Sequence, residues 1–178
     1  VDLIPKGEAL IIADAKRGDI GNTAARYGKA FFETSDCDAI TVNPYMGEDS
    51  ITPFLAYAGK WTIVLGLTSN KGAQDVELLE LKDGRFVFEA VIERVAELGS
   101  SDNLMFVVGA TQTDHLERVR KIIPDHFLLV PGVEHGGRAF RLHADQFHLR
   151  LLCLNGQPQP GNQTAASDGA QYPIHIRL

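Results

Sequence analysis

The chain carries the sequence Ile11-Ile12-Ala13-Asp14-Ala15-Lys16-Arg17-Gly18-Asp19-Ile20-Gly21 close to its first residue. An apolar run over residues 9–13 leads directly into two carboxylates and two cations within six residues. If the strand continues, its period of two places the side chains of Asp14 and Lys16 on one face, and Asp19 follows in the turn. At the carboxyl end of a buried parallel strand such groups project into a pocket. We therefore interpret them as a functional cluster, with a surface salt-bridge cluster as the alternative.

Composition and charge limit the classes of function. The 178 residues are 44% apolar and 22% charged, which is typical of one folded domain with a sizeable core. The net charge of -6 argues against a broad nucleic-acid or membrane footprint, although it allows a local anion site. Cys37 and Cys153 lack the paired spacing of zinc or redox sites. Because the apolar runs are too short to span a membrane and no secretory signal is evident, we expect a cytoplasmic protein.

Apolar runs alternate with segments of helical periodicity along most of the chain. Strands are predicted at 9–14, 39–43, 61–67, 104–108 and 127–130, and helices at 23–32, 50–59, 86–98 and 114–123. Residues 75–84 fit either a short helix or a strand. This βα alternation predicts a parallel sheet, either open or closed into a barrel. The first loop lacks the G-x-G-x-x-G sequence of a dinucleotide-binding fold.

The predicted helix at 86–98 has the clearest pattern. Its apolar stripe is assigned to the core, and the acidic residues between, including Glu89, are expected to face solvent. Ser50 and either Asn22 or Thr23 are candidate N-caps of two other helices. The histidines are expected to be structural, because none has the spacing of a metal ligand, and only His135 adjoins a candidate ligand loop.

Polar loops follow the other strands as well. Asn43 ends the second strand, where it can line a pocket or cap a turn. Thr68 and Ser69 begin a hydroxyl-rich loop after the third strand, which offers a ligand several donors. The fifth strand leads into Pro131-Gly132-Val133-Glu134-His135-Gly136-Gly137-Arg138. Its glycines let backbone N–H groups approach an anion such as phosphate, although a plain tight loop has the same composition.

The pattern changes after Arg138. Histidines and arginines interrupt any amphipathic face between residues 139 and 154, and residues 155–171 are rich in glycine, proline, glutamine, asparagine and serine. We therefore divide the chain into one βα domain over 1–154 and an irregular segment over 155–178.

These motifs resemble those of one enzyme family. The run from Asp14 to Gly21 resembles the D-x-K-x-x-D-I motif of orotidine 5'-phosphate decarboxylase, above all the branch with D-A-K-R-G-D-I-G. Further matching segments are Val42-Asn43-Pro44-Tyr45-Met46-Gly47, Leu67-Thr68-Ser69-Asn70, Val107-Val108-Gly109-Ala110-Thr111 and Val130-Pro131-Gly132-Val133 with Gly136-Gly137. The resemblance spans residues 1–137.

The resemblance implies a TIM (β/α)8 barrel of the ribulose-phosphate-binding type that acts as a homodimer. It implies decarboxylation of orotidine 5'-phosphate to uridine 5'-phosphate in de novo pyrimidine synthesis, with no metal or cofactor. Lys16 would protonate the C6 carbanion, with Asp14 and Asp19 in the charged network. Asp19, with Ile20 and Thr23, would reach the partner subunit's site. The implied substrate contacts are Thr68 or Ser69 to the pyrimidine and Pro131, Gly132, His135, Gly136 and Gly137 at the phosphate.

The chain departs from the family pattern at both ends. The first two barrel strands would precede Val1, together with an aspartate and a lysine of the charged network, so we expect an incomplete barrel. The phosphate loop, normally P-G-I/V-G-A-Q-G-G, is one residue shorter here and has His135 in place of glutamine. Nothing in residues 139–178 matches the S-S-R-G-I context of the family's phosphate-binding arginine.

Three other functions stay open on the sequence. One is a magnesium-dependent sugar-phosphate decarboxylase, which shares the Asp-x-Lys-x-x-Asp strand end. Another is a non-catalytic remnant that binds a nucleotide or dimerises. The third, a Schiff-base aldolase, is disfavoured because two flanking carboxylates favour a charged Lys16 over a neutral nucleophile.

Overall fold

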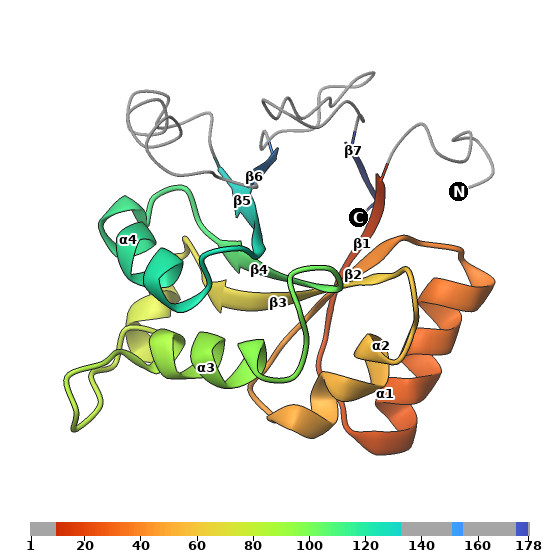
Figure 1. The fold of residues 1–178 in the computed structure, drawn as a ribbon, viewed down its shortest axis with the longest axis horizontal. Coiled ribbons are helices and arrows are strands. Elements are labelled where there is room, and N and C mark those ends of the chain that lie inside the picture. The colour runs from red at the N-terminus through yellow and green to blue at the C-terminus, as the bar shows by residue number, and fades with distance from the viewer. Residues whose placement is uncertain (1–9, 133–150, 155–173, 178) are drawn as a thin grey trace.

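The computed structural model describes residues 10–132, 151–154 and 174–177. The strands are β1 (Leu10–Arg17), β2 (Ala39–Val42), β3 (Trp61–Leu67), β4 (Leu104–Val108), β5 (Phe127–Pro131), β6 (Leu151–Leu154) and β7 (Ile174–Arg177). They form one sheet in the order β6-β5-β4-β3-β2-β1-β7, in which every neighbouring pair is parallel (Figure 1). The five predicted strands are confirmed, and β1 extends beyond its predicted end to Arg17.

Helical segments connect the strands from β1 to β5, which confirms the βα alternation in this part of the chain. They are α1 (Gly21–Gly28), continued by a π-helix (Lys29–Thr34), a 3-10 turn (Glu48–Ser50) before α2 (Thr52–Leu55), a second 3-10 turn (Lys71–Asp75), α3 (Val87–Ala96) and α4 (Thr113–Ile122). Residues 76–84 form neither of the two elements that their sequence allowed. They contain turns and one isolated antiparallel bridge between Glu80 and Phe86.

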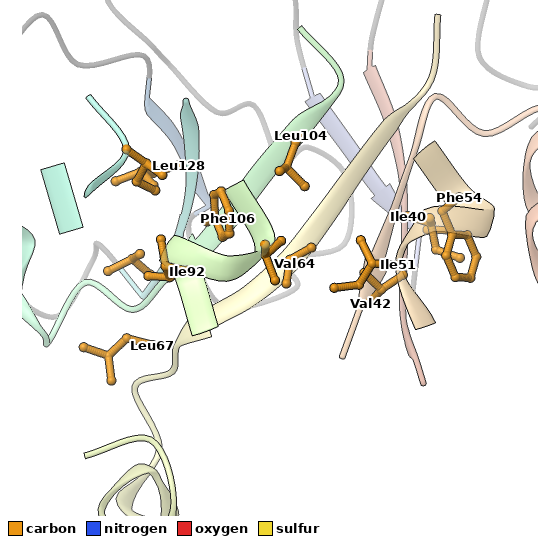
Figure 2. Packing of buried hydrophobic residues seen from close by; sticks show 14 of the residues in the cluster. Ile40, Val42, Ile51, Phe54, Val64, Leu67, Ile92, Leu104, Phe106 and Leu128 are labelled. Carbon is orange, nitrogen blue, oxygen red and sulfur yellow. The ribbon is translucent and has the colours of Figure 1, made fainter. Parts of the chain in front are cut away.

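The two faces of the sheet are covered differently. On one face, strand residues such as Phe106 and Leu128 pack with helix residues such as Ile92 of α3 (Figure 2). On the other face, the buried cluster consists of strand residues: Ile12, Ala39, Ile63, Met105, Val107 and Leu129. This layering is that of a barrel wall, with helices outside and strand side chains inside.

Two predicted N-caps differ from the structure. α1 has Ile20 at its N-cap position with no side-chain cap, so neither Asn22 nor Thr23 caps it. The Ser50 hydroxyl donates to the carbonyl of Gly47 at 2.7 Å and closes the 3-10 turn, while α2 begins later, at Thr52.

The prediction that Glu89 faces solvent is wrong. The residue is only 7% exposed, and its Oε2 accepts a hydrogen bond from the Phe86 N–H at 2.8 Å. The same oxygen lies 2.7 Å from Nη1 of Arg118 on α4. Glu89 therefore caps the first turn of α3 and links two helices, because a carboxylate near a helix N-terminus satisfies an otherwise free donor.

The two edges of the sheet are formed by β6 and β7. β7 pairs with β1, in the place where the resemblance puts the preceding barrel strand. Its sequence, Ile174-His175-Ile176-Arg177, alternates apolar and polar residues as strands do, although we predicted irregular structure there. The predictions for residues 155–173 and for His135, Gly136 and Gly137 lie outside the described residues. The division into a domain and a tail stays a prediction.

Candidate active site

The carboxyl end of β1 is irregular where the charged cluster lies. The pairing of β1 with β2 shifts register between Ala13 and Arg17, and Lys16 has a φ of 43°. This left-handed conformation costs a residue other than glycine about 1–3 kcal/mol. A register shift of this kind redirects a side chain at a strand end.

Asp14 and Lys16 meet at this irregularity, which confirms that they share a face. Nζ of Lys16 lies 2.6 Å from each carboxylate oxygen of Asp14. The Lys16 side chain is 54% exposed, so its ammonium is open to a molecule approaching from solvent. Arg17 does not join this pair, because its guanidinium lies over the ring of Tyr27 and donates to the carbonyl of Ala15.

Thr41 of β2 is a third member of this cluster that the sequence reasoning missed. Its side chain is buried, and its hydroxyl lies 2.9 Å from Oδ1 of Asp14. The Thr41 hydroxyl oxygen also accepts a hydrogen bond from the Lys16 N–H at 2.9 Å. The sequence did contain a signal for this role. Thr41 is the one polar residue in the buried strand Ala39–Val42, and a buried hydroxyl needs a hydrogen-bond partner.

Asp19, Ile20 and Thr23 follow the Asp14–Lys16 pair in the loop and the first turn of α1. Asp19 uses Oδ1 to accept the N–H of Ile20, and within residues 10–132 no hydrogen bond or ion pair joins it to Lys16. Ile20 is 50% exposed, and Thr23 lies on the exposed side of α1.

Asn43 caps a turn, one of the two roles that its sequence position allowed. Its Oδ1 accepts the N–H of Tyr45 at 2.9 Å, and its own N–H donates to the carbonyl of Arg17 at 2.7 Å. A Cβ on Gly18 would lie 3.3 Å from the Asn43 Cβ, so this turn packs closely on the loop after β1.

The loop after β3 is anchored from both sides. Thr68 donates its N–H to Glu77 at 2.6 Å and its hydroxyl to the same carboxylate at 2.8 Å. Its carbonyl accepts a hydrogen bond from Nε2 of Gln112 at 2.8 Å. Thr68 is thus engaged within the chain, whereas the adjacent Ser69 is exposed. Sequence reasoning missed Glu77 and Gln112, and only the unassigned region around Glu77 signalled an unusual element.

The ends of β3, β4 and β5 lie close together. A Cβ on Gly109 would lie 2.6 Å from the Ser69 Cβ, so only glycine allows this approach without a shift. The Ala110 N–H donates to the carbonyl of Pro131 at 3.0 Å, and Gly132 follows with a φ of 85°. The site residues of the described strands therefore gather at the carboxyl ends of the strands.

Comparison with known proteins identifies the family. The model of the orotidine 5'-phosphate decarboxylase / HUMPS family matches residues 1–146. The chain belongs to this family. Orotidine 5'-phosphate decarboxylase of Phocaeicola vulgatus is 58% identical over 126 residues, which cover 71% of this chain and 46% of that relative. The orotidine 5'-phosphate decarboxylase of Bacteroides fragilis is 57% identical over 126 residues, which again cover 71% of this chain and 46% of that relative. The chain thus spans about half the length of these curated relatives.

Solved structures of the family agree with the fold. The OMP decarboxylase of Leishmania donovani has a TM-score of 0.69 and 43% identity, covering 74% of this chain and 52% of that chain. The UMP synthase of the same organism has a TM-score of 0.74 and 39% identity, and the match covers 84% of this chain and 35% of that chain. The parallel sheet of β1–β5 with its outer helices is therefore part of a TIM barrel, which confirms the predicted fold class.

No group of three or more histidine, cysteine, aspartate or glutamate side chains within the described ranges is arranged to hold a metal ion. None of the helices in those ranges has the length and apolar character needed to cross a membrane.

Proposed function

We propose that this chain carries the catalytic lysine of an orotidine 5'-phosphate decarboxylase, a carboxy-lyase that forms uridine 5'-phosphate in de novo pyrimidine synthesis. The observation that carries the proposal is the Asp14–Lys16 pair at the carboxyl end of β1, in a chain of this family. The names of the curated relatives favour this branch of the family.

The chemistry explains why a lysine is needed. When the bond from C6 to the carboxylate breaks, carbon dioxide leaves and the electron pair stays on C6, which has no neighbouring electron sink. A positioned cation stabilises that charge, and an Nζ–H of Lys16 then passes to C6. The exposed amine regains its proton from solvent. Asp14, at 2.6 Å, holds the ammonium in place and crowds the substrate carboxylate.

The remaining site residues receive roles from the family resemblance. Ser69 contacts the pyrimidine, because Thr68 is engaged by Glu77 and Gln112. The loop with Pro131, Gly132, His135, Gly136 and Gly137 binds the phosphate. No cofactor or metal takes part in these steps.

A homodimer completes this site. Asp19 bonds its own backbone neighbour rather than Lys16, and Ile20 exposes half of its apolar side chain. Both features are compatible with Asp19, Ile20 and Thr23 reaching the site of a second copy. The cytoplasm is the proposed compartment, based on the sparing use of cysteine.

Loss of orotidine 5'-phosphate absorbance on mixing with the purified chain tests this function. We expect turnover, and we expect it to persist when a chelator is added. The substitution Lys16→Ala should lower turnover by about 10³-fold or more, whereas the surface control Lys121→Ala should leave it unchanged. Nucleotide binding without turnover by the wild-type chain would contradict the proposal and support a non-catalytic remnant. Turnover of a sugar phosphate that stops in the chelator would support the magnesium-dependent alternative.

A further inference from the structure

Thr41 connects both members of the proposed catalytic pair from a neighbouring strand. It is 1% exposed and lies in the middle of β2, so it cannot touch a substrate itself. Its hydroxyl oxygen lies 2.9 Å from the Lys16 N and 2.9 Å from Oδ1 of Asp14. Both contacts reach across the register shift of β1.

The direction of these hydrogen bonds is determined by the chemistry of the groups. The Lys16 amide can only donate, so the Thr41 hydroxyl accepts from it and directs its own proton to the Asp14 carboxylate. Donors and acceptors aligned in this way strengthen one another. The chain of bonds holds the Lys16 backbone at its φ of 43° and orients the Asp14 carboxylate that binds the Lys16 ammonium.

We propose that Thr41 is a positioning residue that sets the placement of Asp14 and Lys16 relative to each other. This inference rests on the proposed decarboxylase function for its catalytic consequence. Because Thr41 acts on the catalytic groups and not on the substrate, its loss changes kcat and leaves KM nearly unchanged.

Thr62 provides a matched control. It lies on the adjacent strand β3 and is fully buried, and its hydroxyl has no hydrogen-bond partner among the described residues. Thr41→Val and Thr62→Val therefore remove the same group from buried positions on adjacent strands, and only the first group is hydrogen-bonded to the pair. Thr41→Ser keeps the hydroxyl, and Thr41→Ala is a second hydroxyl-free variant in case valine does not fit.

The full chain is tested by amide hydrogen exchange at Lys16, by the NMR signal of the Lys16 Nζ and by kinetics with orotidine 5'-phosphate. For Thr41→Val and Thr41→Ala we expect Lys16 amide exchange faster by about tenfold, a shifted Nζ signal and kcat lower by about tenfold, with KM within about twofold. Thr41→Ser and Thr62→Val should resemble the wild type in all three measurements.

Three results would overturn the inference. The first is Lys16 exchange in Thr41→Val equal to that in Thr62→Val. The second is faster exchange of the Lys16 amide hydrogen together with an unchanged kcat, which would show that the Thr41 hydroxyl has only a structural role. The third is Thr41→Ser behaving like Thr41→Val. If the wild-type chain shows no turnover, the proposed function fails, whereas the exchange and Nζ measurements still decide whether Thr41 positions the pair.

Discussion

At the scale of single residues, the pair formed by Asp14 and Lys16 differs from the surface ion pairs of the chain. Arg85 donates from Nε and Nη2 to Oδ2 of Asp83, but both side chains are about half exposed and lie at a turn. Exposed pairs of that kind contribute little to stability. Asp14 is more buried, is bonded by Thr41 and holds a lysine whose backbone is strained.

Asp14→Asn is expected to lower turnover by about 10²–10⁴-fold, because the amide keeps the shape but not the charge that holds the ammonium. The matched control is Asp83→Asn, which should leave turnover and the urea midpoint near their wild-type values. Steady-state kinetics with orotidine 5'-phosphate check both variants. Equal effects of the two substitutions would remove Asp14 from the charged network.

His115 and His126 pack against aromatic rings, a setting typical of structural histidines. His115 lies against the rings of Phe86 and Phe88, and His126 lies against Phe106. Burial is the main cause that lowers the pKa of His126, and nearby Arg120 adds to it while Asp125 opposes it. The unfolded chain therefore takes up this proton first as the solution becomes acidic.

The contribution of neutral His126 to stability is present above its ordinary pKa of 6.5 and is lost as pH falls below that value. His126→Phe should therefore lose less free energy of unfolding than the wild type between about pH 7.5 and about pH 5.5. Urea unfolding at the two pH values measures this difference, with His115→Phe as the control. Parallel pH dependences of wild type and His126→Phe would contradict the assignment.

At the scale of elements, the loops after β3 and β4 are held at the carboxyl ends of the strands by residues from other segments. Glu77 and Gln112 bind the loop after β3, and Ala110 binds the end of β5. The periodicity of 75–84 predicted no definite element, and the structure explains why. Glu77 binds the loop after β3 and Leu78 packs against the core, while the backbone between them and Gly84 forms turns.

Glu77→Ala should lower the free energy of unfolding by about 1–3 kcal/mol, because the half-buried Thr68 N–H loses its partner. It should also raise KM for orotidine 5'-phosphate, since Ser69 follows Thr68 directly. The control Glu93→Ala removes a carboxylate from a surface pair with Arg85 and should change stability by less than about 1 kcal/mol. Urea unfolding and kinetics measure both effects, and an unchanged KM would separate Glu77 from the site.

At the scale of the whole molecule, the described chain is one wall of a barrel and half of a proposed dimer. Its sheet carries helices on one face, and β7 lies beside β1 at one end of the sheet. Asp19 and Lys16 lie close together in the sequence, yet each is proposed to serve a different site of the dimer.

Mixing Lys16→Ala with Asp19→Asn tests this arrangement. Each variant alone should be nearly inactive. Equilibrated heterodimers contain one site with both residues intact, so the mixture should recover about a quarter of wild-type turnover. Mixing either variant with an equal amount of itself is the control. No recovery despite subunit exchange would place Asp19 and Lys16 in the site of the same subunit.

The sequence alone determined the order of strands and helices, the family and the shared face of Asp14 and Lys16, because these depend on local periodicity and on one continuous motif. Only the tertiary structure decided that Thr41, 25 residues from Lys16, binds the pair and that Gln112, 44 residues from Thr68, holds the loop. Such partners are determined by strand register and by the close approach of loops. Those features result from packing the whole sheet, so no local pattern reveals them.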